Sequence, residues 1–475
     1  MIFFLNLKSL IFNLISLLSI NMRFIITVFF SISLILTAFS QEPEEVVKSI
    51  FNNALTDNTA EEHLLYLCKN TKGRIPGSQQ ALHAVRYTYN ALIEAGADTV
   101  WLQEVPVPHW ERGNEQAVLK SKLGALELTI SALGLSVGTG PGGIDSRLIE
   151  IHDFKQLEEI GSDRIKDKIV FFNRPVDNTI INTFSGYGGA VDQRISGASE
   201  AAKFGALAVI VRSPTQAMHD FVHTGVVRYK EDIPRIPAVC LSPHDANLLS
   251  RWLNEDEEAV LHLVSDCKNY PDTVSFNVIG EITGHEKPGE YITVGGHLDA
   301  WDISEGAHDD GGGCVQSIET IRLFHELEIK PRRSIRAVMF MNEEMTSTGG
   351  QVYADEAEKR GEMHYAALES DRGVMSPIGF GFGNADDERL EELFRLDKYF
   401  TPYGIRYFAR GGGGSDISPL RRLNTLQIGY IPDSQRYFWF HHSANDKFEQ
   451  VNIREMQMGS AAIASLIYLI DLYDL

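Results

Sequence analysis

The residues best suited to chemistry are histidines and acids in the C-terminal half of the chain. Imidazole and carboxylate ligands without thiolate suit Zn²⁺ or a similar cation, whereas Ca²⁺ and Mg²⁺ prefer shells of oxygen alone. Two metal ions held close together need one bridging carboxylate and further terminal ligands on each ion. The candidate ligands are His297, Asp309, Glu344, Asp371 and a histidine of the pair His441–His442. This set predicts two zinc ions per chain.

Two further acids are left over for catalysis. Glu343 directly precedes Glu344 and is free to act as the general base for an attacking water. Asp299 lies two residues after His297 and can orient that imidazole from outside the ligand set. We therefore assign catalytic roles to Glu343 and Asp299 in a metal-dependent hydrolysis.

The adjacent histidines His441 and His442 leave a choice of ligand. In an extended segment their side chains point to opposite sides, so only one would enter the site easily. Ser443 and Asp446 could close a local turn that fixes the imidazole of His442, as short polar side chains often do. This favours His442 as the ligand, with His441 facing a neighbouring wall, and His441 is the alternative.

Single pieces of this pattern are commonplace, and only their joint placement gives them weight. A lone His-x-Asp is usually a hydrogen bond, an Asp-Asp-Gly is usually a turn, and paired acids are usually solvated. Here the candidates follow separate strand-like segments or lie in glycine-rich loops, so they would converge on one crevice. Because buried like charges are costly unless neutralised, a pair of divalent cations would explain why so many acids meet there.

The elements that must hold these side chains alternate between strands and helices. Short apolar runs predict strands, and a 3.6-residue apolar period predicts helices. The strands are expected at 291–295, 335–341, 364–368 and 425–430, and the helices at 315–327, 350–359, 386–399 and 452–472. This alternation predicts an α/β sheet with helices on both faces, whose functional residues collect past the carboxyl ends of the strands.

A different sequence pattern between residues 126 and 270 predicts an inserted domain. Short β-like runs recur there, with one helix-like stretch at 198–204. We therefore expect a mostly-β domain at 126–270, inserted into a main domain formed by 41–125 and 271–475. The glycine-rich stretch at 138–142 contains Pro141 and lacks a strand–turn–helix frame, so it predicts a loop and no dinucleotide site.

Composition excludes several classes of protein. The 475 residues are 44% hydrophobic and 23% charged, which is typical of a folded globular chain. A formal net charge of -21 repels phosphate backbones and argues against a nucleic-acid partner. The cysteines lie far apart without a Cys-x-x-Cys pair, which predicts buried thiols, and a single Cys68–Cys267 bridge is the alternative.

The first 40 residues predict a targeting segment. The apolar run 24–37 has the length of a signal-peptide core, Met22-Arg23 supplies a basic start, and Ala38-Phe39-Ser40 is a small-x-small cleavage site. We expect Met22 to be the true start, cleavage before Gln41, and a secreted or periplasmic protein without stable membrane association. The segment holds two apolar runs, separated by Asn21, Met22 and Arg23. A membrane anchor spanning both runs is the alternative, although the run 24–37 is short for a span.

Several motifs together resemble the M28 family of metallopeptidases, and the resemblance covers nearly the whole mature chain. The motifs are Pro108-His109-Trp110-Glu111-Arg112-Gly113, Gly296-His297-Leu298-Asp299 with Trp301-Asp302, Asp309-Asp310-Gly311-Gly312-Gly313 and Tyr437-Phe438-Trp439-Phe440-His441-His442-Ser443. The resemblance implies a phosphorylase/hydrolase-like zinc exopeptidase domain with eight strands, and it makes the insert a protease-associated domain. It further implies peptide substrates and a homodimer.

Carried over position by position, the resemblance implies a role for each candidate. Asp309 matches the bridging ligand, His297 and Asp371 match the ligands of one zinc, and Glu343 matches the general base. Glu344 and the histidine match the ligands of the other zinc. Family members place this histidine directly before Ser or Thr, which again favours the second of the two histidines.

The chain also departs from the family pattern. Cys314 follows the glycine triplet where a smaller alanine is expected. Arg372 follows Asp371 where a small residue is usual, and its guanidinium could pair with a substrate carboxylate or with a neighbouring acid. The segment Gly411–Gly414, followed by Ser415-Asp416, resembles a substrate-side loop, and a flexible connection is the alternative.

These inferences predict a secreted dizinc exopeptidase that cleaves dipeptides or short peptides with free termini. An aminopeptidase of the same family, which reads only the free amine, is the first alternative. A non-catalytic ectodomain on the same fold is a second, but relatives of that kind lose ligands and this chain fills every position. A glutaminyl cyclase is a remoter alternative, because those enzymes use one zinc and lack the insert.

Overall fold

A computed structural model of the chain describes residues 42–475. The predicted targeting segment and its cleavage site therefore lie outside the described residues. The first described helix is α2 (Pro43–Thr56), and it is followed by α3 (Thr59–Asn70) and α4 (Gln79–Glu94).

The main sheet has eight strands within the described residues, as the family resemblance implies. Their spatial order is β1 (Thr99–Glu111), β10 (Lys268–Ile282), β12 (Arg333–Phe340), β11 (Lys287–His297), β13 (Met363–Glu369), β16 (Leu426–Pro432), β14 (Pro377–Gly383) and β15 (Tyr407–Arg410). The central strands β12, β11, β13 and β16 run parallel, whereas β10 and β14 flank them antiparallel. The carboxyl ends of the four parallel strands therefore meet at one edge.

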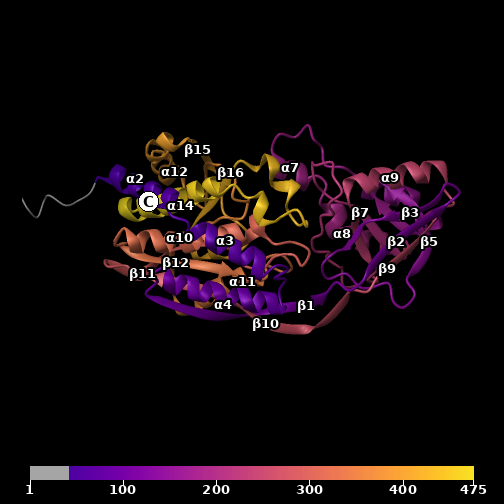
Figure 1. The fold of residues 1–475 in the computed structure, drawn as a ribbon, viewed down its shortest axis with the longest axis horizontal. Coiled ribbons are helices and arrows are strands. Elements are labelled where there is room, and N and C mark those ends of the chain that lie inside the picture. The colour runs from indigo at the N-terminus through magenta and orange to yellow at the C-terminus, as the bar shows by residue number, and fades with distance from the viewer. Residues whose placement is uncertain (1–41) are drawn as a thin grey trace, which may run out of the picture. The chain divides into compact units, whose positions relative to one another are not determined.

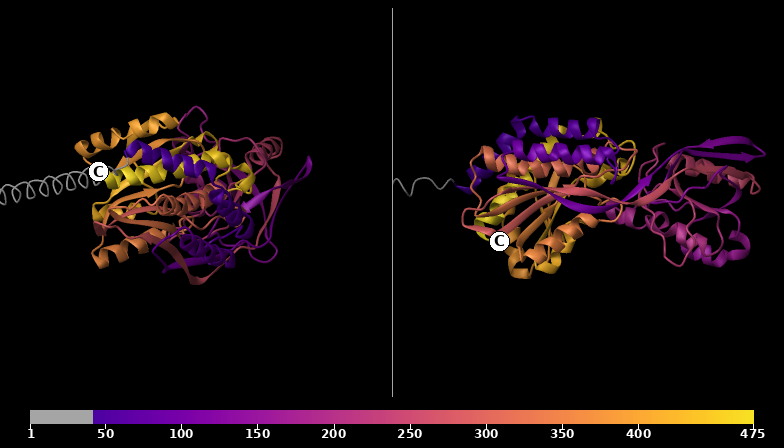
Figure 2. Two further views of the ribbon diagram at one scale, coloured as in Figure 1. Left: turned by 60° about the vertical axis from the view of Figure 1, so that its left-hand side comes forward. Right: turned by 90° about the horizontal axis from the view of Figure 1, so that it is seen from below.

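Helices cover both faces of this sheet, as Figure 2 shows. Val338 and Phe340 of β12 pack against Tyr353 and Ala354 of α11 (Thr348–Arg360). Because side chains alternate along a strand, the intervening residues of β12 face the other side, where α10 (Gly312–Glu326) lies. The helix α14 (Ile453–Tyr473) packs beside α10, and 78% of its apolar stretch is buried, as expected for a core helix.

Polar residues fix where several helices begin. The Asn452 side chain accepts a hydrogen bond from the Glu455 backbone N–H, so α14 starts where the sequence predicted. Asp386 caps the predicted helix 386–399 in the same way, by accepting a hydrogen bond from the Arg389 backbone N–H. That helix is shorter than predicted, because α12 (Asp387–Phe394) ends and a separate turn, α13 (Asp397–Phe400), follows.

Residues between β1 and β10 form a second sheet, also of eight strands within residues 42–475 (Figure 1). Its spatial order is β3 (Gly124–Leu128), β2 (Glu115–Ser121), β9 (Val260–Ser265), β5 (Ile144–Ile151), β6 (Ile169–Phe172), β7 (Ala208–Arg212), β8 (Ala238–Leu241) and β4 (Ile130–Ala132). The sheet begins at β2, earlier than the predicted first residue of the insert, because the sequence pattern did not separate β2 from β1.

The second sheet carries helices as well as strands. They are α5 (Phe154–Ile160), α6 (Ser162–Ile165), α7 (Thr183–Gly188), α8 (Asp192–Ala202) and α9 (Pro243–Glu255). Of these, only the end of α8 was predicted, because α8 has a weakly amphipathic sequence rich in small and polar residues. Two apolar clusters pack on the sheet, and one of them includes Trp301 and Met345 from the main part of the chain.

The chain enters and leaves the second sheet through one two-stranded ribbon. β1 and β10 pair antiparallel from Thr99↔Glu281 to Glu111↔Lys268, with an irregularity near His109.

All four cysteines are buried and free, so the Cys68–Cys267 bridge does not form.

Candidate metal centre

One group of candidate ligands gathers at the end of β11. The His297 Nε2 atom lies 3.2 Å from the Asp309 Oδ1 atom and 3.6 Å from the Asp371 Oδ1 atom. His297 is the last residue of β11 and Asp371 follows β13. Asp309 lies in η1 (Ala307–Gly311), the segment before α10, and has non-helical backbone angles there. Their ligand atoms lie within 4.8 Å of one another, which is compatible with one shared metal ion.

A second group shares Asp309 with the first. The His442 Nε2 atom lies 2.9 Å from the Glu344 Oε2 atom and 3.5 Å from the Asp309 Oδ2 atom. The two oxygens of Asp309 therefore face different groups, as a bridging carboxylate requires. The structure thus brings together all the residues that the sequence proposed as ligands.

Several atoms of this cluster are buried without a hydrogen-bond partner. They are the Asp309 Oδ2, Glu344 Oε1 and Asp371 Oδ1 atoms. Buried polar atoms are rarely left unsatisfied, and the Asp309 and Asp371 oxygens lie 3.5 and 3.6 Å from imidazole nitrogens, so this cluster fits a cation site. Imidazole nitrogens and carboxylate oxygens are also the donor set that Zn²⁺ accepts. The residues present therefore fit zinc.

The electrostatics lead to the same conclusion. Burial raises the pKa of Asp371 to about 6 and raises the pKa of Glu344 well above its usual range. Burial acts on Asp309 in the same direction, but the neighbouring histidines outweigh it and lower its pKa. Divalent cations would reverse the first two shifts, because a nearby positive charge favours the ionised carboxylate.

Two buried acids position the loop that carries Asp309. The Asp446 carboxylate accepts hydrogen bonds from the backbone N–H groups of His308, at 2.8 Å, and Asp309, at 3.1 Å. The Asp310 carboxylate accepts from the backbone N–H groups of His297, at 3.0 Å, and Gly313, at 2.9 Å. Asp446 was expected only to close a local turn, and no pattern in the sequence indicated that its carboxylate contacts the distant Asp309 loop.

Asp299 has contacts that differ from those expected. The His297 Nδ1 atom lies 3.0 Å from the Asp299 backbone oxygen but 3.9 Å from its carboxylate. The Asp299 carboxylate instead accepts hydrogen bonds from the backbone N–H groups of Asn342, Glu343 and Glu344. Its side chain therefore fixes the loop after β12, while the imidazole is oriented by the backbone.

Glu343 differs sharply from Glu344. Within residues 42–475 its half-buried carboxylate makes no hydrogen bond or ion pair, whereas the Glu344 carboxylate accepts a 2.6 Å hydrogen bond from Trp301 Nε1. A free carboxylate beside candidate ligands is what a general base needs.

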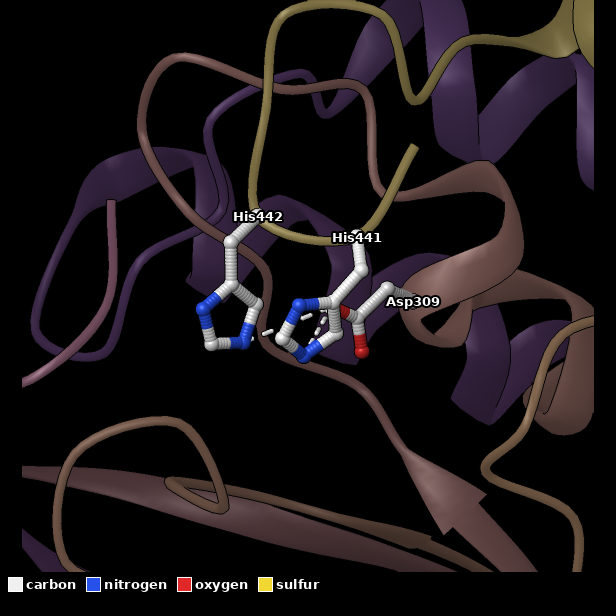
Figure 3. A group of neighbouring side chains, drawn as sticks. All are labelled: Asp309, His441 and His442. Atoms are coloured by element: carbon white, nitrogen blue, oxygen red, sulfur yellow. Dashed lines mark ion pairs between the residues drawn. The ribbon is translucent and has the colours of Figure 1, made fainter. Parts of the chain in front are cut away.

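The two neighbouring histidines do not point to opposite sides, so that expectation is wrong. Their rings stack with centroids 3.5 Å apart, and both face Asp309 (Figure 3). The prediction assumed an extended segment, but His442 has a left-handed backbone with φ of 60° and follows the short helix η4 (Ser434–Trp439). The His441 Nε2 atom lies 3.8 Å from Asp309, farther than that of His442.

Residues of α8 and of the loop between β7 and β8 hold this histidine segment in place. The Thr224 backbone N–H donates a 3.0 Å hydrogen bond to the His442 backbone oxygen, and His223 Nδ1 donates one of 2.6 Å to the His441 backbone oxygen. Arg194 Nη1 donates to the Thr224 oxygen and lies 3.2 Å from the His442 Nδ1 atom. Sequence reasoning missed these three residues, because they lie more than two hundred positions before the histidines and belong to no recognisable motif.

This fold and this cluster of imidazoles and carboxylates define a metal-dependent hydrolase. The family model described as Peptidase family M28 matches residues 277–467. Carboxypeptidase Q of Mus musculus is 33% identical over 432 residues, which cover 90% of this chain and 89% of that relative. The chain therefore belongs to peptidase family M28 and is a metallopeptidase.

Solved structures support the same fold. A Peptidase M28 precursor from Shewanella amazonensis superposes with a TM-score of 0.86 at 30% identity, over 90% of this chain and 96% of that chain. The zinc aminopeptidase BSAP from Bacillus subtilis has a TM-score of 0.64 at 19% identity, over 87% of this chain and 94% of that chain. The second comparison shows the fold alone.

Proposed function

We propose that this chain is a dizinc exopeptidase that hydrolyses dipeptides or short peptides with free termini. The observation that carries the proposal is the pair of groups that share Asp309. His297 and Asp371 meet at one side of it, and His442, which also contacts Glu344, lies at its other oxygen. In this proposal His297 and Asp371 would hold one zinc, Glu344 and His442 would hold the other, and Asp309 would be shared by both.

The zinc pair, when bound, supplies Lewis acidity and an activated water. Glu343 takes the proton from the attacking water and later passes it to the leaving amine. Asp299 keeps Glu343 in place through its hydrogen bond from the Glu343 backbone N–H group, at 3.2 Å. The indole N–H group of Trp301 donates a hydrogen bond to the Glu344 carboxylate. This contact fixes Glu344 as a ligand and leaves Glu343 free to act as the base.

The comparisons favour a carboxypeptidase-like specificity, because relatives that cover about nine-tenths of the chain are named carboxypeptidase Q. The imidazole and carboxylate donor set supports zinc as the metal, and an aminopeptidase of the same family, which reads only the free amine, is the second candidate. We also propose that the protein is exported, acts as a homodimer, and carries a protease-associated domain in its second sheet.

A panel of dipeptides tests the proposal. Each peptide is supplied free, amino-blocked and carboxyl-blocked, and is incubated with the metal-free protein before and after addition of Zn²⁺. Zinc-dependent cleavage that requires a free carboxylate is expected. Cleavage that requires only the free amine would establish the aminopeptidase, and no zinc-dependent cleavage of any peptide would overturn the proposed function.

A further inference from the structure

Arg372 directly follows the candidate ligand Asp371 and is held in a fixed turn. The next residue, Gly373, has a φ of 81°, and a Cβ atom there would lie 2.9 Å from the Tyr437 ring. The turn therefore packs against Tyr437 and needs glycine for both its conformation and its closeness. This places the half-buried Arg372 at the margin of the metal centre.

The guanidinium of Arg372 has no acid to neutralise it. Its Cζ atom lies 4.9 Å from the Phe184 ring centroid, and within residues 42–475 it makes no ion pair with Asp or Glu. By contrast, Arg322 and Arg336 each bind carboxylates at 2.6–2.7 Å. Of the two partners that the sequence suggested for Arg372, the neighbouring acid is therefore absent.

Phe184 belongs to an aromatic cluster that also borders the site. Its ring stacks on Tyr437, with centroids 5.4 Å apart, and meets Phe438 edge-on at 4.9 Å. Tyr437 and Phe438 each lie 5.2 Å from the His441 ring. Phe184, Tyr437 and Phe438 therefore form an aromatic wall that both Arg372 and His441 border. Arg372 is next to the candidate ligand Asp371, and His441 is next to His442.

Arg74 and Arg194 also lie near this site, and their surroundings exclude them as substrate contacts. Arg74 is buried and donates to the backbone oxygens of Leu298, Glu305 and Gly306. Arg194 is buried as well. Its side chain is 4% exposed, and Gly225 lies directly against it. It approaches His442 at Nδ1, whereas the metal-facing atom of that ring is Nε2. Arg194 therefore contacts the His442 ring at the nitrogen that faces away from Glu344, and its Cζ atom lies 5.6 Å from the Tyr187 ring centroid. Arg372 is the arginine that lies against Phe184 next to Asp371.

We propose that Arg372 binds the free C-terminal carboxylate of the peptide substrate. This inference rests on the proposed function, and it assigns the residue that makes the enzyme recognise a carboxyl terminus. The carboxylate of a dipeptide lies one residue beyond the scissile bond, so its receptor must lie close to the metal ligands. The planar guanidinium suits bidentate binding of a carboxylate.

The test compares a dipeptide with the same dipeptide carrying a C-terminal amide. Values of kcat/KM for both are measured with the zinc-loaded wild type, Arg372→Ala, Arg372→Lys and a control, Arg147→Ala. Arg147 is an exposed residue paired with Glu258, so its loss removes one positive charge away from the site. Zinc content is measured on every preparation.

We expect Arg372→Ala to lose about 10- to 100-fold in kcat/KM on the free dipeptide, because charge-assisted hydrogen bonds are lost. Activity on the amide should stay within about threefold of wild type, Arg372→Lys should be intermediate, and Arg147→Ala should match wild type. An unchanged preference for the free carboxylate in Arg372→Ala would overturn the proposal. Equal losses on both substrates would also overturn it, since they indicate a structural role.

Binding gives a readout that does not depend on turnover. The affinity of the product amino acid and of its amide is measured by calorimetry for wild type and Arg372→Ala. Selective loss of amino-acid affinity supports the role of Arg372 even if neither peptide is hydrolysed. Absence of hydrolysis by the wild type would instead count against the proposed function.

Discussion

Glu343 and Glu344 are neighbours with different surroundings, and these predict different consequences of mutation. Glu343→Gln should retain the fold and both zinc ions but lose about 10²–10⁴-fold in turnover, because an amide cannot accept the proton. Glu344→Gln is the matched variant, and it should lose zinc. Metal analysis and kinetics on the same preparations decide between the roles. Loss of zinc from Glu343→Gln would show that Glu343 is the ligand and would assign the role of base to Glu344.

The pair His441 and His442 gives a second prediction for single residues. His442→Ala should release about one zinc per chain, because His442 contacts both Glu344 and Asp309. His441→Ala should keep both ions and change KM, because the His441 ring packs on the aromatic wall. Atomic absorption and steady-state kinetics measure the two effects. Two zinc ions retained in His442→Ala and one lost in His441→Ala would reverse the assignment.

At the scale of single residues, the sequence was informative where chemistry and strand ends coincide. His297 and Asp371 could be proposed because each follows an apolar strand, and Asp309 because it lies in a glycine-rich loop. The orientation of His441 could not be predicted, because it depends on a helical turn and a left-handed residue that have no periodic signature. The contacts of the Asp446 carboxylate likewise depend on two loops that meet only in the folded chain.

At the scale of elements, the loop 223–225 supports the metal centre from the second sheet. Gly225 has a φ of 135°, and a Cβ atom there would lie 2.4 Å from the Arg194 Cζ atom. Gly225→Ala should displace Arg194 and Thr224, and so weaken zinc binding at the His442 group. A loss of about 10- to 100-fold is expected, as for other residues that orient ligands.

Gly124→Ala is the matched control for this loop. Gly124 also has a positive φ, of 121°, but its Cβ atom would meet nothing within 4 Å. Zinc affinity is measured by competition with a chelator for both variants. If Gly225→Ala held its second zinc as tightly as Gly124→Ala does, the loop would have no supporting role.

The far end of the main sheet carries an ionic network that predicts acid sensitivity. Burial raises the pKa of Glu362, but hydrogen bonds with His364 and Arg336 outweigh it and lower that pKa to about 2. Its ordinary value is 4.5, so Glu362 stabilises the fold fully above pH 4.5 and loses this contribution as the pH falls towards 2. Arg336 also binds Glu281, so the network joins β10, β12 and the residue before β13.

Glu362→Gln should therefore lower the free energy of unfolding at neutral pH, and the difference from wild type should shrink below pH 4.5. Urea unfolding at a series of pH values measures it. Glu358→Gln serves as the control, because Glu358 pairs with Arg422 at an exposed site and should change little. A difference that is constant with pH would contradict the prediction.

The strands and helices of the main sheet could be predicted from the sequence, whereas those of the second sheet could be predicted only in part. Buried parallel strands give continuous apolar runs such as 335–341, which need little context to recognise. Strand β4 spans only Ile130–Ala132, and such a short run carries too little pattern to separate it from a loop. Helix α8 is dominated by small and polar residues, so only its C-terminal end resembled a helix.

At the scale of the whole molecule, zinc should stabilise the fold as well as enable catalysis. Chelation should abolish peptide hydrolysis and lower the melting temperature, because metal that binds only the folded chain adds to its stability. Adding Zn²⁺ should restore both quantities. Calorimetry and peptide assays on one verified metal-free preparation measure them. Full activity without metal would contradict the prediction.

The ribbon formed by β1 and β10 has a consequence for how this architecture changes over time. Because Glu111 and Lys268 are paired, the points where the chain leaves and rejoins the main sheet are neighbours. The whole intervening segment could be gained, lost or exchanged in one genetic event, and a short hairpin would close the gap. Such a deletion would also remove Thr224 and Arg194, so in a descendant without this segment other residues would have to position His442.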